Sequence, residues 1–179
     1  MFLAFGIPGL TLDELPLADA QNEYFSQTHD RDAVKQYAQK FISDPGKQNG
    51  LYWKVAEGET ESPIGPLVAY ATAQGYGGQQ DTPQPFHGYL YRLLTGRVNS
   101  KGQTKRFLVD GKMTGGFAVV AYPAEYRNSG VMTFVIDDKG IMYEKDLGET
   151  TAGVANSLRA FNPKGWRIVT EDQGGNSSN

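Results

Sequence analysis

The sequence predicts an α+β fold in which helices from the first half of the chain pack on an antiparallel sheet formed by the second half. Two observations favour this class. Runs with β-strand patterning follow one another between residues 85 and 147, separated by turn residues: GYLYRLLT, KRFLV, GGFAVVAYP, GVMTFVID and IMYEKDL. Upstream of this meander, apolar residues recur at helical spacing. With 179 residues, 39% of them hydrophobic, the chain can bury a substantial core.

Two helices are expected before residue 50. Asp13 is placed to cap the first, with Pro16 in its first turn and Leu17, Ala20 and Tyr24 along its buried face. The charged sequence HDRD interrupts this pattern. A second helix, or the second half of a kinked one, then stops at the sequence SDPG; its apolar stripe consists of Val34, Tyr37, Ala38 and Phe41.

A third helix begins with Ser62 as its N-cap and Pro63 at its first position, and it ends at Gly75. The preceding loop, residues 48 to 61, contains Tyr52 and Trp53. A loop that carries Trp is usually fixed to the body of the protein, so this loop is expected to be anchored. The following stretch, GYGGQQDTPQPFHG, is predicted to connect the helices to the sheet.

The clearest element is a hairpin from residue 131 to residue 147. Residues 131, 133 and 135 lie on one face of its first strand and residues 132, 134 and 136 on the other, and both faces are largely apolar. The sequence DDKG supplies the turn. Each face is therefore expected to be covered, one by a helix and the other by a second layer, a loop or a partner.

Beyond the hairpin, Thr150 or Thr151 is expected to cap a short helix that runs through Ala160. The sequence NPKG then turns the chain into a final strand from Trp166 to Thr170. The predicted organisation is an N-terminal segment (residues 1–17), a single α+β domain (18–170) and a flexible tail (171–179).

Composition excludes several classes of function. A net charge of −3, with basic residues spread among acids, gives no reason to expect nucleic-acid binding. The absence of cysteine excludes disulfides, thiolate metal sites and a Cys nucleophile. No apolar run is long enough to predict a transmembrane segment, and the apolar start MFLAFGIPGL lacks the basic region and cleavage site of a signal peptide.

Segments spread along the chain resemble the second half of a bacterial family of domains of unknown function, family 2950. They are DAQNEYF, VKQYAQKFISDPGKQNGLYW, AEGETESPIGPLVA, PFHGYLYRLLT, GGFAVVAYPAEYRNSGVMTFVIDDKGIMYEKDLG and AFNPKGW, and the resemblance covers about Ala18 to Ile168. Members are mostly exported proteins of Gram-negative bacteria with no established activity. The resemblance therefore implies a periplasmic or secreted location and supplies no cofactor.

The chain departs from this family pattern at two places. Similar proteins carry a signal peptide and a further N-terminal domain, whereas residues 1–17 resemble neither, which suggests a truncated gene, a wrong start codon or a minimal variant. Relatives also have an acidic, Gly-rich turn where this chain has HDRDA. Without the additional acids and the Gly, a calcium loop lacks its ligands and its sharp bend, so no metal site is expected.

A more distant similarity is to the soluble head of type IV pilin-like proteins. It is carried by a helix followed by GYLYRLL and FAVVAYPAEYRNSGVMTFVIDDKGIMY. It implies a helix packed on an antiparallel sheet, and a function in presenting a surface to partners. The hydrophobic transmembrane helix of a true pilin is absent from the sequence.

Residues that could carry catalysis are few. No serine lies in the Gly-x-Ser-x-Gly elbow that would accompany a Ser-His-Asp device. Glu57, Glu59 and Glu61 come nearest to a pair of catalytic carboxylates, and the adjacent Tyr52 and Trp53 could form a platform on which a sugar stacks. A solvated acidic loop explains the same pattern and is the preferred interpretation.

Aromatic and basic residues are the candidates for binding. The aromatic set is Tyr52, Trp53, Tyr122, Tyr126 and His87, although His87 also fits a strand-end residue bonded to backbone. Tyr122 and Tyr126 flank Pro123 in a predicted turn, where exposure is expected. A basic cluster around the hairpin turn GKMTGG fits either a polyanion such as a phosphorylated glycan or a solvated surface; it comprises Arg92, Arg97, Lys101, Lys105, Arg106 and Lys112.

These features favour a noncatalytic envelope or secreted module that binds a partner protein or a glycan. The alternative is a glycan-directed hydrolase that uses the carboxylates of residues 57–61. The two hypotheses differ in whether the glutamates are buried beside a pocket or exposed in a loop.

Overall fold

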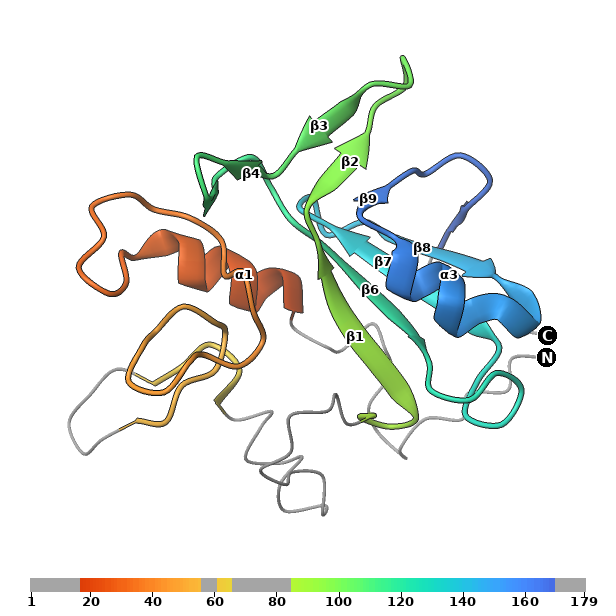
Figure 1. The fold of residues 1–179 in the computed structure, drawn as a ribbon, viewed down its shortest axis with the longest axis horizontal. Coiled ribbons are helices and arrows are strands. Elements are labelled where there is room, and N and C mark those ends of the chain that lie inside the picture. Colours follow the sequence, from red (N-terminus) through yellow and green to blue (C-terminus); the bar gives the residue numbers. More distant parts are fainter. Residues whose placement is uncertain (1–16, 56–60, 66–84, 170–179) are drawn as a thin grey trace, which may run out of the picture.

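The structure, a computed structural model, describes residues 17–55, 61–65 and 85–169. Its centre is a five-stranded antiparallel sheet in the order β1-β6-β7-β8-β10. Figure 1 labels β1, β6, β7 and β8 of this sheet. The strands are β1 Tyr89–Leu94, β6 Ala118–Pro123, β7 Met132–Asp137, β8 Met142–Asp146 and β10 Arg167–Ile168. The predicted antiparallel meander is confirmed, and the fold is α+β with few and short helices.

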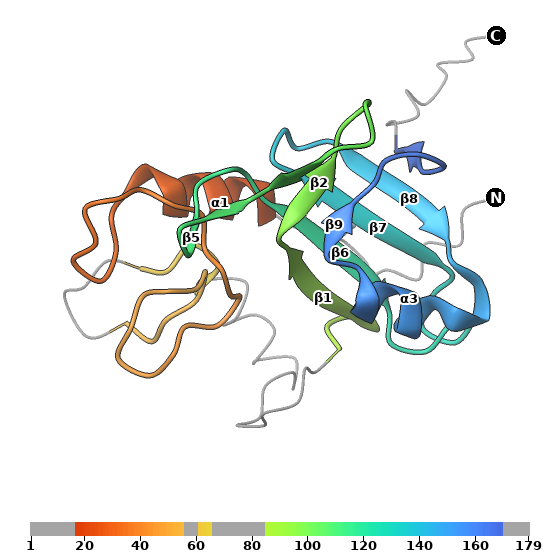
Figure 2. The ribbon, with the colours of Figure 1, turned by 45° about the horizontal axis from the view of Figure 1, so that its top comes forward.

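Two smaller sheets adjoin the large one. Three strands pair in the order β3-β2-β9, with β2 antiparallel to β3 and parallel to β9, and β2 and β9 lie side by side in Figure 2. The strands β4 and β5 form a separate hairpin. The bounds are β2 Gly96–Val98, β3 Thr104–Arg106, β4 Leu108–Val109, β5 Lys112–Met113 and β9 Ala160–Phe161.

The run KRFLV is divided between β3 and β4, whereas the sequence predicted one strand. Phe107 stands at the break, with its side chain buried in the core. Its N–H donates to the carbonyl of Thr95 at 2.8 Å and its carbonyl accepts from the N–H of Gly115 at 2.9 Å. The ring is therefore turned inward and the backbone changes partner at this residue, which ends one strand and begins another.

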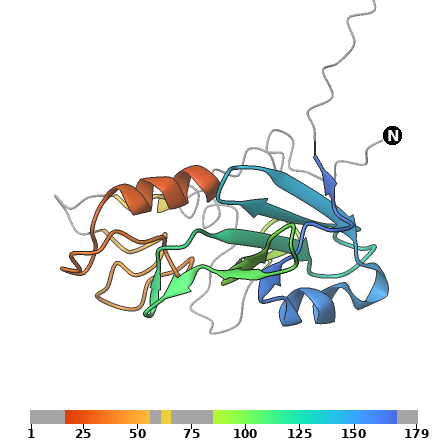
Figure 3. The ribbon, with the colours of Figure 1, turned by 90° about the horizontal axis from the view of Figure 1, so that it is seen from above.

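The two faces of the large sheet are covered differently. Along β7, Thr133, Val135 and Asp137 are buried and alternate with half-buried residues. Helix α3 (Thr151–Ser157) packs against β6 on the buried side, where the Tyr122 hydroxyl donates to Asn156 Oδ1 at 2.9 Å. Figure 3 shows α3 on one side of the sheet and α1 towards the other.

The opposite face carries a shallow apolar hollow. It is lined from the sheet by Tyr91, Val119, Ala121, Phe134, Ile136 and Met142, and from α1 by Leu17. Both faces of the hairpin strand therefore meet other parts of the protein, as its two apolar faces predicted.

Helix α1 spans Leu17–Ser26, and its buried residues recur at helical spacing. Leu17, Ala20 and Tyr24 form the predicted buried face, which is confirmed. The fourth buried residue is Gln21, whose amide donates to the carbonyl of Ala38 at 3.0 Å and accepts from its N–H at 2.8 Å. Burial of this amide is stabilised because both of its polar atoms are hydrogen-bonded.

The helix predicted for residues 34–41 is wrong. This segment is irregular, because its backbone is bonded to distant partners rather than to itself. The Tyr37 N–H donates to the carbonyl of Met113 at 2.9 Å, and the Met113 N–H donates to Gln36 Oε1 at 3.2 Å. Those tertiary hydrogen bonds tie the segment to β5 and outweigh its helical apolar spacing.

The region after residue 55 is described only in part. Of the third predicted helix, the structure describes Ser62 to Gly65, where the Gly65 N–H donates to the carbonyl of Ser62 at 2.8 Å. Residues 66–84 lie outside the described residues, and so does most of the predicted connection to the sheet.

The C-terminal region differs from prediction in detail. A 3₁₀ turn, η2 (Gly148–Thr150), leads into α3, and Thr151 donates its hydroxyl to the carbonyl of Gly148 at 2.5 Å instead of capping α3. The helix ends at Ser157, earlier than predicted, because the chain becomes extended at Leu158 and enters β9. β9 was not predicted as a strand.

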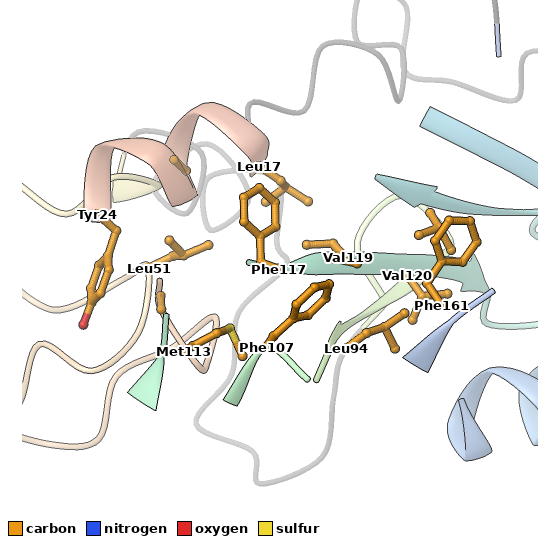
Figure 4. Close-up of a cluster of buried hydrophobic side chains, with 14 of the residues drawn as sticks. Leu17, Tyr24, Leu51, Leu94, Phe107, Met113, Phe117, Val119, Val120 and Phe161 are labelled. Carbon is orange, nitrogen blue, oxygen red and sulfur yellow. The ribbon is translucent and has the colours of Figure 1, made fainter. Parts of the chain in front are cut away.

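The core is continuous from α1 across the sheets to β9 (Figure 4). Its largest fully buried side chains include Phe107, Phe117 and Phe161. Every residue of β6 is buried, which is expected for a strand covered on both faces. By contrast, every residue of β3 is exposed.

Candidate functional site

The three-stranded sheet β3-β2-β9 joins segments that are far apart in the sequence. Gly96 pairs with Arg106 on one side and with Ala160 on the other. Residues paired in this way project from the same face of a sheet. Arg106 therefore lies on the Gly96 face, and its neighbour Lys105 lies on the opposite face.

An open hollow of about 340 Å³ lies over Gly96. A Cβ atom at Gly96 would lie 2.9 Å from the carbonyl oxygen of Lys105 and 3.4 Å from the Cβ of Ala160. The hollow is therefore deeper at Gly96 than it would be with any other residue there. The lining consists of Thr95, Gly96, Thr104, Arg106, Leu108, Arg159 and Ala160. The hollow thus has two arginines in its lining, Arg106 from β3 and Arg159 from the residue before β9.

The predicted basic cluster separates into two groups. Three of its members form hydrogen bonds or ion pairs within the protein. Arg92 donates to the carbonyls of Ala155 and Leu158, Arg97 pairs with Asp137, and Lys112 pairs with Asp32. The other three are Lys101, Lys105 and Arg106, which are exposed and form no ion pair with the residues that the structure describes.

Tertiary structure adds Arg159 to this surface. Its guanidinium donates to the carbonyl of Asn156 at 2.7 Å, and no described carboxylate pairs with it. We call Arg106 and Arg159, together with the hollow over Gly96, the cationic surface; Lys105 adds a positive charge on the opposite face of β3. Sequence reasoning missed Arg159 because it placed this residue in a helix, although the alternation in LRAF before NPKG is also typical of a short strand.

Behind this surface lies a buried ion pair. Asp137 is fully buried and accepts from the Arg97 guanidinium through Oδ2. Its Oδ1 accepts from the N–H groups of Lys139 and Ile141, each at 3.0 Å, which closes the turn of the β7–β8 hairpin. Arg97 also donates to the Tyr143 hydroxyl at 3.0 Å.

The second buried carboxylate in the described part, Glu144, pairs with Arg167. Both buried carboxylates therefore have structural partners, and neither is arranged as half of a catalytic acid and base pair.

The predicted catalytic carboxylates do not form a described cluster. Glu57 and Glu59 lie outside the described residues, and Glu61 is exposed. The adjacent Trp53 is only 6% exposed, so its ring faces the protein interior rather than a sugar-binding surface.

Trp53 belongs to an aromatic cluster with α1. Its ring lies 5.6 Å from His29 and 6.4 Å from Tyr24, and the rings of His29 and Tyr24 are stacked at 3.8 Å. The Tyr24 hydroxyl donates to the carbonyl of Gln48 at 2.5 Å. Burial raises the pKa of Tyr24 to about 12, and the nearby aspartates add to this effect. The described part of this loop, residues 48–55, is thus anchored, as its tryptophan predicted.

The predicted aromatic binding residues do not converge on one groove. Tyr52 is half-buried, and its backbone bridges to the segment around Ile42. Tyr122 is buried, which corrects the expectation of exposure: β6 continues through Pro123, so the ring projects towards α3. Tyr126 is half-buried in the turn after β6, and its hydroxyl donates to Asp146 Oδ2 at 3.2 Å.

His87 lies in a tight turn before β1. Its φ of +50° is in the left-handed region, its ring meets Phe86 edge-on at 4.0 Å, and burial lowers its pKa. A Cβ atom at the next residue, Gly88, would lie 2.8 Å from the Cβ of Ser129. The Ser129 hydroxyl is engaged with the backbone of Glu125, at 3.0 Å to the N–H and 3.2 Å to the carbonyl, so it is not poised as a nucleophile.

Two further properties concern only the described residues. They contain no group of three or more His, Asp or Glu side chains placed to hold a metal ion. None of their helices has the length and apolar character needed to span a bilayer.

Comparison with known proteins gives a family and no relative of established activity. The model of a family described as "Protein of unknown function (DUF2950)" matches residues 12–169, which is most of the chain. Neither the curated proteins nor the solved structures contain a match.

Proposed function

Because the chain belongs to the DUF2950 family of proteins of unknown function, we propose a function from its surface: it is a noncatalytic binding module, periplasmic or secreted, that holds an anionic group of a partner protein or glycan. The observation that carries the proposal is the unpaired charge of the cationic surface. Arg106 of β3 and Arg159, directly before β9, both line the hollow, and Lys105 adds a positive charge on the opposite face of β3. None of the three has a carboxylate partner among the described residues.

This concentration of charge stands out against the rest of the chain. The protein as a whole has a net charge of −3, and Arg92, Arg97 and Lys112 of the basic cluster are neutralised or bonded internally. Arginine presents a planar fork of donors that matches carboxylate and phosphate groups. Two arginines beside a floor of glycine suit one anionic group better than an apolar ligand.

The glycan-directed hydrolase has less support. Of its three glutamates, only Glu61 is described, and it is exposed. An exposed carboxylate lacks the buried setting in which catalytic carboxylate pairs work. Export of the protein is supported by the family resemblance, and fractionation of cells that express the native gene tests it.

Charge removal tests the proposed binding. The double variant Arg106→Gln/Arg159→Gln is expected to bind polyacrylate, a carboxylate polymer, at least about tenfold more weakly than the wild type, because charge-assisted hydrogen bonds each contribute about 1.5–3 kcal/mol. Wild-type binding is also expected to weaken with added salt. Fluorescence anisotropy with labelled polymer measures both effects.

The matched control removes two exposed positive charges elsewhere, in Lys35→Gln/Lys54→Gln. This control should bind nearly as the wild type does. Equal affinity of the wild type and of both double variants would contradict the proposal, and so would equal losses in the two variants.

A further inference from the structure

The outer strand of the small sheet has a free edge. In the order β3-β2-β9, β2 separates the other two strands, and β3 lies on the outside (Figure 1). All three residues of β3 are exposed. An exposed edge strand presents backbone N–H and C=O groups that another extended chain can bind.

The register shows which groups face outward. In the β2–β3 hairpin, the Asn99 N–H donates to Gln103 and the Phe107 N–H donates to Thr95, both at 2.8 Å. Hydrogen-bonded pairs alternate along an antiparallel ladder, so Lys105 is the bonded residue between these positions and faces β2. Thr104 and Arg106 consequently direct their N–H groups away from β2.

No other hydrogen bond within the described residues reaches these outward groups. The Thr104 N–H and carbonyl and the Arg106 N–H have no backbone or side-chain partner there. The Arg106 carbonyl differs, because a Cβ atom on Gly115 would lie only 2.5 Å from it. The available edge is therefore short and centred on Thr104.

Charge determines what can occupy this edge. Lys105 projects from one face of β3 and Arg106 from the other, and both are exposed and unpaired within the described residues. A second copy of β3 would place like charges opposite one another, which is destabilising. An extended segment rich in Asp and Glu would place opposite charges on both faces.

The hollow extends this complementarity. A partner residue opposite Arg106 has its side chain on the Gly96 face. A carboxylate there meets Arg106 at the rim of the hollow, with Arg159 on the far side. Backbone pairing and charge pairing would thus be satisfied by the same acidic strand.

We infer that β3 binds an extended acidic segment of a partner protein by strand addition, with backbone hydrogen bonds at Thr104 and carboxylates on Lys105 and Arg106. This inference rests on the proposed function and selects a protein over a glycan as the partner. A glycan could use the charges, but it has no repeating amide N–H and C=O groups to match a strand edge.

A backbone variant separates strand addition from charge attraction. Thr104→Pro removes the outward N–H without removing a hydrogen bond to β2, and proline is tolerated at the first residue of a strand. It is expected to bind a labelled peptide of alternating Glu and Val at least about tenfold more weakly than the wild type. Its affinity for polyacrylate, which carries carboxylates but no amides, is expected to be unchanged.

Thr104→Val is the matched control, because it keeps the N–H while removing the hydroxyl, and it should bind the peptide as the wild type does. Circular dichroism and the thermal midpoint establish that each variant is folded. A second measurement uses the wild type with a peptide N-methylated at every residue, which has the same charge and no backbone N–H to donate along either edge. Weaker binding of the methylated peptide supports strand addition even if Thr104→Pro does not fold.

The outcomes distinguish the two proposals. Wild-type peptide affinity in folded Thr104→Pro, or equal binding of the methylated and unmethylated peptides, would overturn strand addition and leave anion binding in place. Loss of polyacrylate binding in folded Thr104→Pro would also overturn it, because the effect would then be electrostatic. Unchanged binding of both probes to Arg106→Gln/Arg159→Gln would overturn the proposed function itself.

Discussion

The carboxylate of Asp32 illustrates how single charged residues hold this protein together. It accepts from the Lys112 ammonium at 2.5 and 2.6 Å and from the Val34 N–H at 3.0 Å. The hydrogen bonds from Lys112, followed by that from Val34, lower the pKa of Asp32 below its ordinary value of 3.8. This ion pair joins residues from the two halves of the sequence, since Lys112 belongs to β5. Lys105 and Arg106, by contrast, have no such partner in the described part.

The Asp32–Lys112 pair gives a pH-dependent prediction. A lowered folded-state pKa contributes stability above the unfolded pKa, and this contribution is lost as the pH falls through the folded pKa. Lys112→Met should therefore unfold at lower urea concentration than the wild type near neutral pH. The difference in urea midpoint should shrink as the pH is lowered below the ordinary Asp pKa of 3.8 and through the lowered folded-state pKa of Asp32.

Lys40→Met serves as the control for this experiment, because Lys40 pairs with Asp44 only four residues away on an exposed surface. Exposed ion pairs between neighbours in the sequence contribute little to the free energy of unfolding. The urea midpoint of Lys40→Met should therefore differ less from that of the wild type than the midpoint of Lys112→Met does. A midpoint difference for Lys112→Met that stays constant as the pH is lowered would contradict a stabilising role of the Asp32–Lys112 ion pair.

At the scale of elements, strand boundaries depend on close backbone contacts. The carbonyl of Phe107 accepts from the Gly115 N–H where β3 gives way to β4. A Cβ atom on Gly115 would lie 2.5 Å from the carbonyl oxygen of Arg106 and 3.0 Å from the Cα of Phe107. Only glycine permits the chain to pass this close, and the contact fixes the hairpin β4–β5 against β3.

A pair of glycine substitutions tests that contact. Gly115→Ala is expected to destabilise the protein by roughly 1–3 kcal/mol, the range of an overpacking change, because its Cβ meets backbone that cannot turn aside. Gly153→Ala is the matched control: this position lies within α3 and has open space around it. There alanine should stabilise by about 0.5–1 kcal/mol through helix propensity. Urea unfolding measures both, and equal effects at the two sites would refute the steric explanation.

At the scale of the whole molecule, the protection of backbone amides against hydrogen exchange is expected to be highest in β6 and to fall with distance from it. β6 is buried along its full length between β1 and β7, whereas β3 is an exposed edge. Regions with few buried contacts open more readily than the core. The free edge that would receive a partner strand is therefore also among the least protected parts of the described structure.

Amide hydrogen exchange can test this gradient residue by residue. The amides of β6 should exchange most slowly, those of Thr104 and Arg106 rapidly, and that of Lys105 more slowly than either neighbour because it is bonded to β2. Two-dimensional NMR of the free protein resolves these amides. Slow exchange at Thr104 and Arg106 in the free protein would mean that the edge is already covered.

The sequence alone determined the elements whose pattern is local. The alternation of MTFVID, the turn DDKG and the spacing of Leu17, Ala20 and Tyr24 each predicted an element that the structure contains. The spacing of apolar residues and the turn residues suffice to predict such elements, because the hydrogen bonds within them join residues that are close in the sequence. The family resemblance also followed from contiguous segments.

Tertiary structure decided the elements and roles that depend on distant partners. The segment 34–41 has helical spacing but bonds to β5, and β9 is a strand only because β2 lies beside it. Likewise, some basic residues of the sequence cluster form internal ion pairs, whereas others are exposed without an ion pair among the described residues. Arg159, which is distant in the sequence, lies beside Arg106 in the lining of the hollow. A residue's partner is set by packing in three dimensions, so local pattern could predict the positive charges but not which of them remain available to bind.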